Sequence, residues 1–558
     1  MKNKDDLSKC LRWGVVATTV YLVCIVLFFY PYFGNFDSAL IGPPEDNMQD
    51  FWNTWYSQNM LETDPSAFFS TRLLFFPDQT SLIYHSFSYP NLIFIFILRK
   101  IFQLPPTHSV LIALHNGMLL LSFYLAALGA YLLIRKFTKD DLTALIGGFI
   151  FGFSPFHLAH ALHHITVATI QFIPFFVLSF LKFIESRKGL PFVGTVLFYL
   201  LSALSCWYYL FYLAYFIVFY YLFHAIGRRQ PIIKELIKPM VSVFVAVLIL
   251  LSPLLIPMVA EGIHNKRVNA GGHNVFVADL LGFVVFHPYH LLGDLTRPIH
   301  SRFTGNAWEL TVYLGMVNIG LLLWVYFKKQ TRQIENLPFC LWGMFFFMLF
   351  AAGAFLHILG KSTYIPLPSG LTQFLPLIRN VRTPSRAIVF VYLFLGIAIS
   401  LILSKTFLTS KNKGRAPVFW FITLLIFVDF YPTHRESTQV TCPPAYRILQ
   451  EDPEKDFGII DLPKGYIEGN HYMMYQTFHQ RPIVNASISR SLKKTLSEEL
   501  NGADLDYEKD QLTRNRVKYV IIHKQLNQKS GYRIPIGKYQ EYYQTLYFDE
   551  ESVVLRVY

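Results

Sequence analysis

Charged side chains are scarce in this sequence. They make up 15% of its 558 residues, whereas hydrophobic residues make up 53%. A soluble protein of this size carries about a quarter charged residues. The composition therefore excludes an ordinary soluble globular protein.

Motifs for nucleotide-driven and metal-dependent chemistry are missing as well. The sequence has no Walker loop, no GxGxxG after a predicted strand, no HExxH and no CxxC pair. No two interrupted helices at matching positions indicate an inverted-repeat transporter. We therefore expect neither a nucleotide cofactor nor ATP-driven pumping by this chain.

Cysteine is rare, with five residues in the whole chain. Cys24, Cys206 and Cys340 fall within apolar runs, and Cys442 is the one cysteine expected outside the cytoplasm. A single cysteine cannot form an intrachain bridge, so we expect no extracytoplasmic disulfide.

Apolar runs of about 20 residues recur along the first 430 positions, which is the pattern of transmembrane helices. Closed barrels are the alternative in lipid, but a run such as 240–258 is too long for a barrel strand. The sequence predicts a polytopic α-helical membrane protein with about 11 transmembrane helices. The expected spans are 13–33, 109–134, 142–156, 167–183, 190–207, 209–226, 239–257, 311–327, 337–356, 386–404 and 417–432.

The distribution of basic residues predicts the orientation. The run at 13–33 is too long for the core of a signal peptide and lacks an A-x-A-like cleavage site, so we interpret it as a span. With a cytoplasmic N-terminus, short cytoplasmic segments hold 21 of the 49 Lys and Arg residues, and the longer outward loops hold fewer. This positive-inside pattern predicts a multi-pass protein of the bacterial cytoplasmic (inner) membrane with an extracytoplasmic C-terminus.

Residues 88–104 do not fit this topology as a full span. The segment is apolar but short, and it ends in Arg99 and Lys100. Counting it as a crossing would invert every later segment and remove the charge bias. We interpret it as an interfacial or re-entrant helix.

The chain is expected to have two parts, a transmembrane body at 1–432 and a soluble extracytoplasmic α/β domain at 433–558. Strand-like runs at 457–463, 517–524 and 552–558 alternate with polar helical stretches in the second part. This part carries 17 basic and 17 acidic side chains, so the net charge of +13 lies in the body. Membrane lipids are therefore the expected partner of the basic residues, and no nucleic acid is expected.

The outward loops 34–108, 157–166, 258–310 and 357–385 contain the candidate chemistry. In EDNMQDFWNTWY (45–56), Asp46 and Asp50 would share one face of a helix, where one carboxylate can act as a general base. Trp52 and Trp55 could stack on a sugar or anchor at the lipid headgroups. A solvated loop with an aromatic belt is the alternative interpretation.

Three further groups are candidates for binding. His157, His160 and His164 are spaced to share one helical face, which suits a metal, a phosphate, proton transfer or a structural edge. Glu309 lies at the start of a span and is either functional or a helix-end carboxylate. The third group consists of arginines, whose guanidinium groups match the geometry of a phosphate. The arginines are Arg379, Arg382 and Arg386, for which anchoring to lipid headgroups is the alternative.

The arrangement resembles multispanning glycosyltransferases of the GT-C fold, which use polyprenyl-phosphate sugars at the extracytoplasmic face. Asp46-Asn-Met-Gln-Asp50-Phe-Trp52 is similar to their D-x-x-x-N-x-W run, with Asp50 in place of the usual Asn. Further similar blocks are FFPDQTSLIYHSFSYP (75–90), the stretch from Gly129 to His164, Glu309 to Gly315, Arg382 to Arg386, and IIDLPKGYIEGNHYMMYQTFHQRPIVNASISR (459–490).

The resemblance implies an inverting transfer of a sugar from a polyprenyl-phosphate donor to an envelope glycan, lipid or protein. Asp46 or Asp50 would be the base, and the substitution at Asp50 leaves both as candidates. Arg382, Arg386 and His164 would stabilise the leaving phosphate. The candidate substrate-binding residues are Trp52, Trp55, His160, Glu309 and Tyr313. Metal dependence varies within this fold, so no metal ligand is assigned.

Two other functions fit the same sequence. A transporter or flippase of lipid-linked sugars would need the basic residues but no base, so substitution of Asp46 and Asp50 would leave it active. A non-catalytic envelope assembly protein would depend on residues 433–558 instead.

Overall fold

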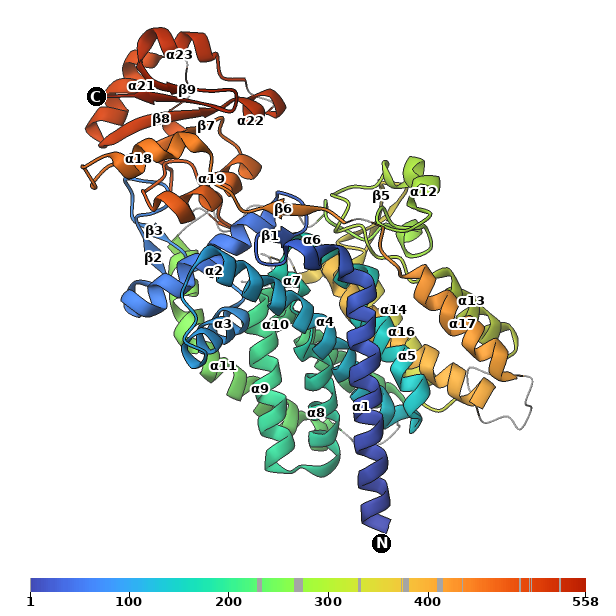
Figure 1. Ribbon diagram of the computed structural model, residues 1–558. Helices are drawn as coiled ribbons and strands as arrows, with labels where there is room; N and C mark the ends of the chain where they lie inside the picture. The colour runs from blue at the N-terminus through green and yellow to red at the C-terminus, as the bar shows by residue number, and fades with distance from the viewer. Residues whose placement is uncertain are drawn as a thin grey trace. The chain divides into compact units, whose positions relative to one another are not determined.

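A computed structural model gives the fold of the chain (Figure 1). It describes residues 2–227, 233–264, 274–329, 333–372, 374, 381–408, 415–433, 435–490, 493–500, 502, 504–530 and 533–558. The chain divides into two compact units. Unit 1 holds 1–34, 117–253 and 269–435, and unit 2 holds 35–116, 254–268 and 436–558, so the division falls inside α4 (His108–Thr138) and α11 (Ile233–His264).

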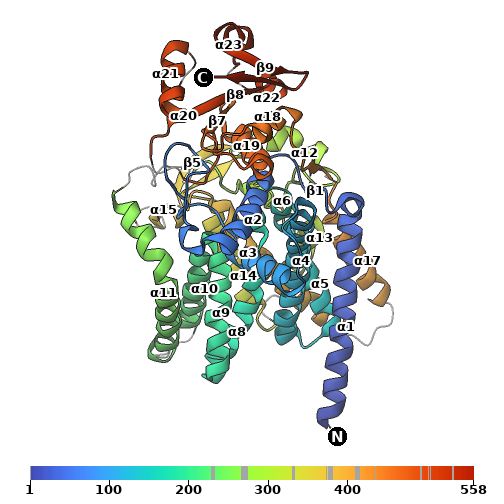
Figure 2. The ribbon, with the colours of Figure 1, turned by 60° about the vertical axis from the view of Figure 1, so that its left-hand side comes forward.

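Unit 1 is a bundle of apolar helices, in which α8, α9 and α10 lie side by side in Figures 1 and 2. Its helices are α1 (Lys2–Phe29), α5 (Asp141–Gly152), α6 (Pro155–His163), α7 (Ile165–Ala168), α8 (Phe172–Ser186), α9 (Gly189–Ser205), α10 (Trp207–Gly227), α12 (Gly293–His300), α13 (Met316–Phe327), α14 (Leu337–Ala351), α15 (Ser369–Thr372), α16 (Ile388–Leu403) and α17 (Arg415–Asp429). Short turns are η1 (Tyr30–Asn35), η4 (Leu280–Phe283), η6 (Pro384–Ala387) and η7 (Ser404–Leu408), and β4 (Phe355–Ile358) pairs with β5 (Lys361–Pro366).

The helical membrane fold expected from the sequence is confirmed at a coarse level. Among the described residues, seven helical segments are long and apolar enough to cross a membrane. Four shorter apolar helices, α9, α13, α14 and most of α17, occupy the other expected ranges. Because these four have 10–17 residues, the total of 11 crossings stays a prediction.

The helices α5 and α16 approach each other backbone to backbone. A Cβ atom on Gly396 would lie 2.7 Å from the carbonyl oxygen of Gly147, and one on Gly147 would overlap Ser400 Oγ. The Ser400 hydroxyl donates to the carbonyl of Thr143 at 2.8 Å across the same contact. Small residues allow this close packing. Because no hydrophobic driving force acts between helices in lipid, such packing and interhelical hydrogen bonds hold the helices together.

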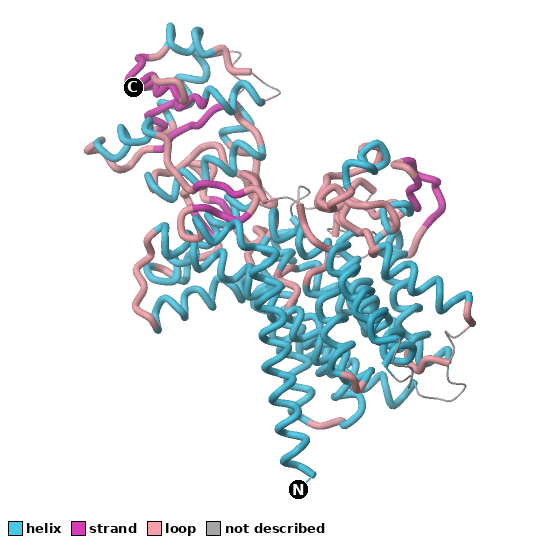
Figure 3. Tube along the Cα trace, turned by 45° about the vertical axis from the view of Figure 1, so that its right-hand side comes forward, coloured by secondary structure: helices cyan, strands magenta, loops and turns pink. Residues whose placement is uncertain are grey.

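Unit 2 contains a four-stranded sheet in the order β7-β8-β10-β9 (Figure 3). The strands β7 (Gly458–Leu462) and β8 (Val517–His523) are parallel, whereas β10 (Ser552–Arg556) is antiparallel to β8 and to β9 (Gln544–Phe548). The three expected strand runs correspond to β7, β8 and β10, and β9 was not expected. The remaining elements are β1 (Ala39–Ile41), α2 (Asp46–Thr63), η2 (Pro65–Ala67), β2 (Ser70–Thr71), β3 (Thr80–Ser81), α3 (Tyr89–Ile101), β6 (Ser437–Gln439), η8 (Pro444–Tyr446), α18 (Arg447–Glu451), α19 (Tyr466–His479), α20 (Leu496–Glu499), α21 (Leu505–Arg514), α22 (Lys524–Lys529) and α23 (Ile536–Tyr542).

The first loop and the C-terminal segment share one hydrophobic core. Strand β1 pairs antiparallel with β6, and α2 contacts α19. Met48, Phe51 and Trp52 lie in the same buried cluster as Tyr472 and Met473. The C-terminal residues therefore belong to a unit that includes 35–116, and a separate domain at 433–558 stays a prediction.

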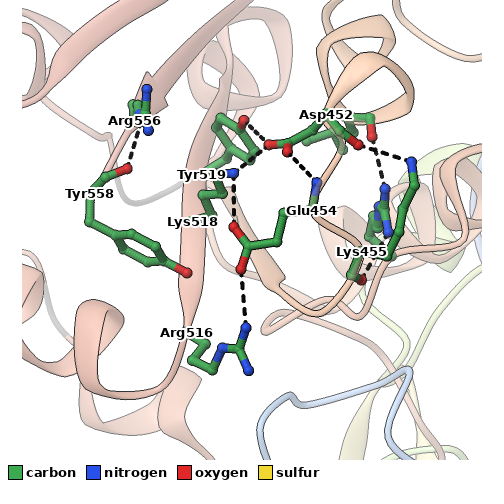
Figure 4. A network of polar contacts seen from close by, with 10 residues as sticks. Asp452, Glu454, Lys455, Arg516, Lys518, Tyr519, Arg556 and Tyr558 are labelled. Carbon is green, nitrogen blue, oxygen red and sulfur yellow. Dashed lines mark hydrogen bonds and ion pairs between the residues drawn. The ribbon is translucent and has the colours of Figure 1, made fainter.

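A network of polar contacts joins the segment before β7 to strand β8 (Figure 4). Lys518 Nζ lies 2.7 Å from Asp452 Oδ2 and 2.9 Å from Glu454 Oε2, and Arg516 donates to Glu454 at 3.1 Å. The Tyr519 hydroxyl donates to Asp452. Because Lys518 contacts both carboxylates and Glu454 contacts both basic side chains, this network fixes the chain before β7 to strand β8.

The close contact of α5 and α16 predicts the effect of two glycine substitutions. Gly147→Leu should lower the free energy of unfolding by about 2 kcal/mol or more, because the added side chain has no space. Gly320→Leu is the matched control, since no heavy atom lies within 4 Å of a Cβ there. Thermal unfolding of the detergent-purified protein measures both, and equal shifts would contradict the predicted contact.

Candidate functional site

A buried ion pair joins two loops of unit 1. Glu309 lies before α13, and Arg386 lies in η6, just before α16. Arg386 Nη2 is 2.5 Å and Nε is 2.9 Å from Glu309 Oε1, and the side chains are 13% and 3% exposed. The Ser385 hydroxyl donates to Glu309 Oε2 at 3.2 Å. The structure thus brings together two residues that the sequence suggested separately.

His160 lies beside this ion pair without a hydrogen bond of its own. It is on α6, is 0% exposed, and its Nε2 lies 3.7 Å from Glu309 Oε2. Neither ring nitrogen has a hydrogen-bond partner among the described residues. An unpartnered buried polar group costs roughly 1–3 kcal/mol, so the imidazole is available to a ligand group.

Aromatic side chains of α10 hold the turn that carries Arg386. The guanidinium carbon lies 4.7 Å from the ring centroid of Tyr208, which is a cation–π contact. The Tyr208 hydroxyl donates to Thr383 Oγ1, and the Tyr212 hydroxyl donates to the Thr383 carbonyl, both at 3.2 Å. These contacts orient Arg386 independently of Glu309.

The three histidines expected on one helical face are divided. Ser154 begins α6 by accepting the His157 amide, and the helix ends at His163, so His164 has extended backbone angles. His157 contacts Ser122 and the Gly152 carbonyl. The expected single face is therefore wrong. The ring of His164 stacks on that of His160 with 5.9 Å between centroids, so His164 stays a candidate for phosphate binding.

Tyr313 belongs to a neighbouring network that sequence reasoning missed. Its hydroxyl donates to Asp429 Oδ1 at 2.8 Å, and His290 Nε2 lies 3.2 Å from the same oxygen. Asp429 is the last residue of α17, and its signal in the sequence is an acidic residue inside the expected span 417–432. The ring of Tyr313 is fully buried, so its role as a substrate ligand stays a prediction.

A small pocket with a cavity volume of about 10 Å³ borders η6. Its walls include Tyr215, Phe350 and Pro384, and the buried Ser369 hydroxyl has no hydrogen-bond partner among the described residues. Arg382 is half-buried and forms no ion pair with a described residue. Arg379 lies outside the described residues.

The two carboxylates of the first outward loop lie on one helix of unit 2. Helix α2 begins at Asp46, so Asp46 and Asp50 are four residues apart on it, as the expected face requires. Asp46 is partly exposed, and its Oδ1 accepts the Asn470 amide at 3.1 Å. Asp50 is 6% exposed. Asp46 is therefore the more accessible of the two candidate bases.

The two tryptophans of α2 lie in the core of unit 2. Trp52 is 0% exposed, stacks on Tyr56 with 4.7 Å between ring centroids, and donates Nε1–H to Gln476 at 2.8 Å. Trp55 is 6% exposed. This burial favours a structural role over the sugar contact or headgroup anchor expected from the sequence.

A second polar cluster at the carboxyl ends of β7 and β8 was also missed. Asp461 Oδ1 accepts hydrogen bonds from the Tyr446 hydroxyl at 2.5 Å and from His523 Nε2 at 3.0 Å. Asp461 is fully buried. Its signal in the sequence is an acidic residue inside the apolar run FGIIDLP. No group of three or more metal-binding side chains occurs among the residues that the structure describes.

A model for DUF6311, a domain of unknown function, matches residues 16–431 of the sequence. The chain belongs to the DUF6311 family. A search of the curated proteins finds no match.

Solved structures resemble this DUF6311 protein at low identity. AftD, an arabinofuranosyltransferase from Mycobacteria, is 12% identical with a TM-score of 0.51, over 92% of this chain and 36% of that one. The Archaeoglobus fulgidus oligosaccharyltransferase, solved with zinc and sulfate, is 12% identical with a TM-score of 0.49, over 91% and 68%. ArnT from Cupriavidus metallidurans, bound to undecaprenyl phosphate, is 10% identical with a TM-score of 0.47, over 98% of both chains. The likeness to AftD supports a shared fold, in agreement with the GT-C resemblance of the sequence.

The ion pair predicts strong coupling between two substitutions in this DUF6311 protein. Glu309→Gln should cost roughly 3–5 kcal/mol, because it leaves Arg386 buried without a carboxylate. The double variant Glu309→Gln/Arg386→Met should cost less than the sum of the single variants. A double-mutant cycle by thermal unfolding measures the coupling, and additive effects would show that the pair contributes nothing.

Buried histidines of unit 2 predict acid sensitivity. Burial lowers the pKa of His85 to about 3, that of His479 to about 3 and that of His471 to about 4. These groups are neutral in the folded protein but titrate near their ordinary pKa when unfolded. Stability should therefore be full above about pH 6.5 and fall as the pH decreases towards 4, by up to about 1.4 kcal/mol per pH unit for each histidine.

The variant His85→Gln isolates one of these contributions. Its melting temperature should depend less on pH between about 6.5 and 4 than that of the wild type. An unchanged pH dependence would mean that His85 titrates normally in the folded state.

Proposed function

We propose that this protein transfers a sugar from a polyprenyl-phosphate donor to an acceptor of the cell envelope, with inversion at the anomeric carbon. The reaction would take place at the extracytoplasmic face of the bacterial inner membrane. The observation that carries the proposal is the buried Arg386, oriented by Tyr208 and Glu309 next to His160, whose ring nitrogens have no hydrogen-bond partner among the described residues. A guanidinium and an imidazole with unsatisfied hydrogen-bonding capacity suit a phosphate oxygen.

In this proposal the leaving phosphate replaces Glu309 as the hydrogen-bond partner of Arg386. Two of the guanidinium N–H groups donate to one carboxylate oxygen, and a phosphate oxygen accepts the same geometry. His160 and His164 would donate further hydrogen bonds, and Arg382 would add a second positive charge. Stabilising the charge that develops on the leaving group is usually the largest catalytic contribution.

Asp46 is the proposed general base. Its carboxylate is partly exposed, and the Asn470 amide donates to its Oδ1, which would orient the carboxylate to accept a proton from an acceptor hydroxyl. Asp50, which is closer to full burial, would position α2. The likeness to AftD supports the fold on which such a reaction depends.

The test is sugar transfer by the purified protein in detergent from a panel of radiolabelled polyprenyl-phosphate sugars. Asp46→Asn should lower turnover by roughly 100-fold or more, because the amide cannot accept the proton. Arg386→Lys should lower turnover as well, because lysine cannot donate two fixed hydrogen bonds. Asp78→Asn, on the same loop, is the matched control and should retain activity.

The outcomes distinguish the competing functions. Donor binding without turnover, unchanged by Asp46→Asn and Asp50→Asn, would favour a flippase. Loss in Asp50→Asn with activity retained in Asp46→Asn would reassign the base.

A further inference from the structure

Helix α3 of unit 2 exposes a row of large apolar side chains, although two of its polar side chains are buried. Asn91 and Arg99 are buried, with 6% and 3% exposure, and both face the protein. Apart from Lys100, which is 56% exposed near the C-terminal end, the exposed side chains form one apolar stripe: Ile93, Phe94, Ile97, Ile101 and, just after the helix, Phe102, which are 42–66% exposed. A helix at a water-exposed surface has the opposite pattern, so this stripe requires an apolar partner.

The length of α3 excludes a membrane crossing. The helix has 13 residues and is therefore about 20 Å long, whereas the hydrocarbon core is about 30 Å thick. An apolar helix that is too short to span can lie in the interface plane with its apolar face among the acyl chains.

Both ends of α3 are tied to the ends of candidate spans. On the N-terminal side, the Tyr84 hydroxyl donates to the Met258 carbonyl, and Ser81 donates to Glu261 at 3.1 Å, near the end of the span Ile237–Ile263. On the C-terminal side, six residues separate Ile101 from the first residue of the span His108–Thr138. The helix is thereby held at the level where these spans meet water.

Arg99 connects this helix to α2. Its guanidinium donates to Gln58 Oε1 at 3.1 Å and to Glu62 Oε1 at 2.9 Å, and the Gln58 amide donates to the Leu92 carbonyl at 3.2 Å. The two helices lie side by side in Figures 1 and 2. Arg99 thus fixes α2, which carries Asp46 and Asp50, to α3.

We propose that α3 lies in the plane of the membrane–water interface with its apolar stripe in the acyl chains, and that Arg99 holds α2 to this lipid-bound helix. The partner is the lipid itself, because the stripe runs from Ile93 to Phe102, the segment before the helix contacts the end of one candidate span, and the segment after it leads into another. The placement does not depend on the proposed sugar transfer.

The experiment measures depth in vesicles of phosphatidylcholine and phosphatidylglycerol that contain the reconstituted full chain. An environment-sensitive fluorophore is attached to Phe94→Cys or Ile97→Cys, and the parent chain labelled in parallel subtracts the native cysteines. The control is Thr513→Cys, which is exposed on α21 of the same unit. Lipids brominated in the acyl chain should quench labels 94 and 97 at least roughly twofold more than label 513, and aqueous iodide should do the reverse.

Two results would overturn the proposal. Iodide access at 94 and 97 equal to that at 513 would place the stripe in water. Protection from both quenchers would mean that a second copy or another protein covers α3.

The role of Arg99 is tested with label 97 in Arg99→Met and in the matched control Lys100→Met, which removes the exposed partner of Glu62. The anisotropy of the label should fall in Arg99→Met alone, and equal changes would reject the connection to α2.

Discussion

The ion pair between Glu309 and Arg386 determines how the candidate site of unit 1 is built. A buried guanidinium and a buried carboxylate are tolerable only together, because each alone would keep a large desolvation cost. Their contact fixes the loop before α13 against the turn before α16. Tyr208, Ser385 and His160 lie around this charge pair and contact it.

Much of the fold could be predicted because its signals are local. Each apolar run is long enough to form a helix whatever its neighbours are, and the strand runs before Pro463 and at 517–523 are recognised by their β-branched residues. The helix over Asp46 and Asp50 follows from local spacing as well. The pairing of Glu309 with Arg386 does not, because 77 residues separate them and no pattern in one segment specifies the other.

The failures have the same physical origin. Histidine spacing predicts a common face only if the helix continues, but α6 ends at His163 and His164 has extended backbone angles. Asp429 was not expected to have a role, because its partners, Tyr313 and His290, come from distant segments. Trp52 was expected to contact a sugar or the lipid headgroups, but it is buried and donates its N–H to Gln476. The local sequence could not indicate this, because Gln476 lies 424 residues further along the chain. When residues far away in the sequence bury a side chain, the sequence around that side chain does not predict its burial.

The shared core of the first loop and the C-terminal segment imposes an order on biosynthesis. Residues 39–41 and the apolar side of α2 find their partners only when residues 437–439 and α19 have been made. At about 5–20 residues per second, a ribosome needs roughly 20–85 s to cover the intervening 424 residues. For that time the emerging loop exposes Met48, Phe51 and Trp52, so it is a natural client for chaperones of the compartment that receives it. A chain terminated before residue 436 would keep this surface open permanently, which marks truncated products for proteolysis.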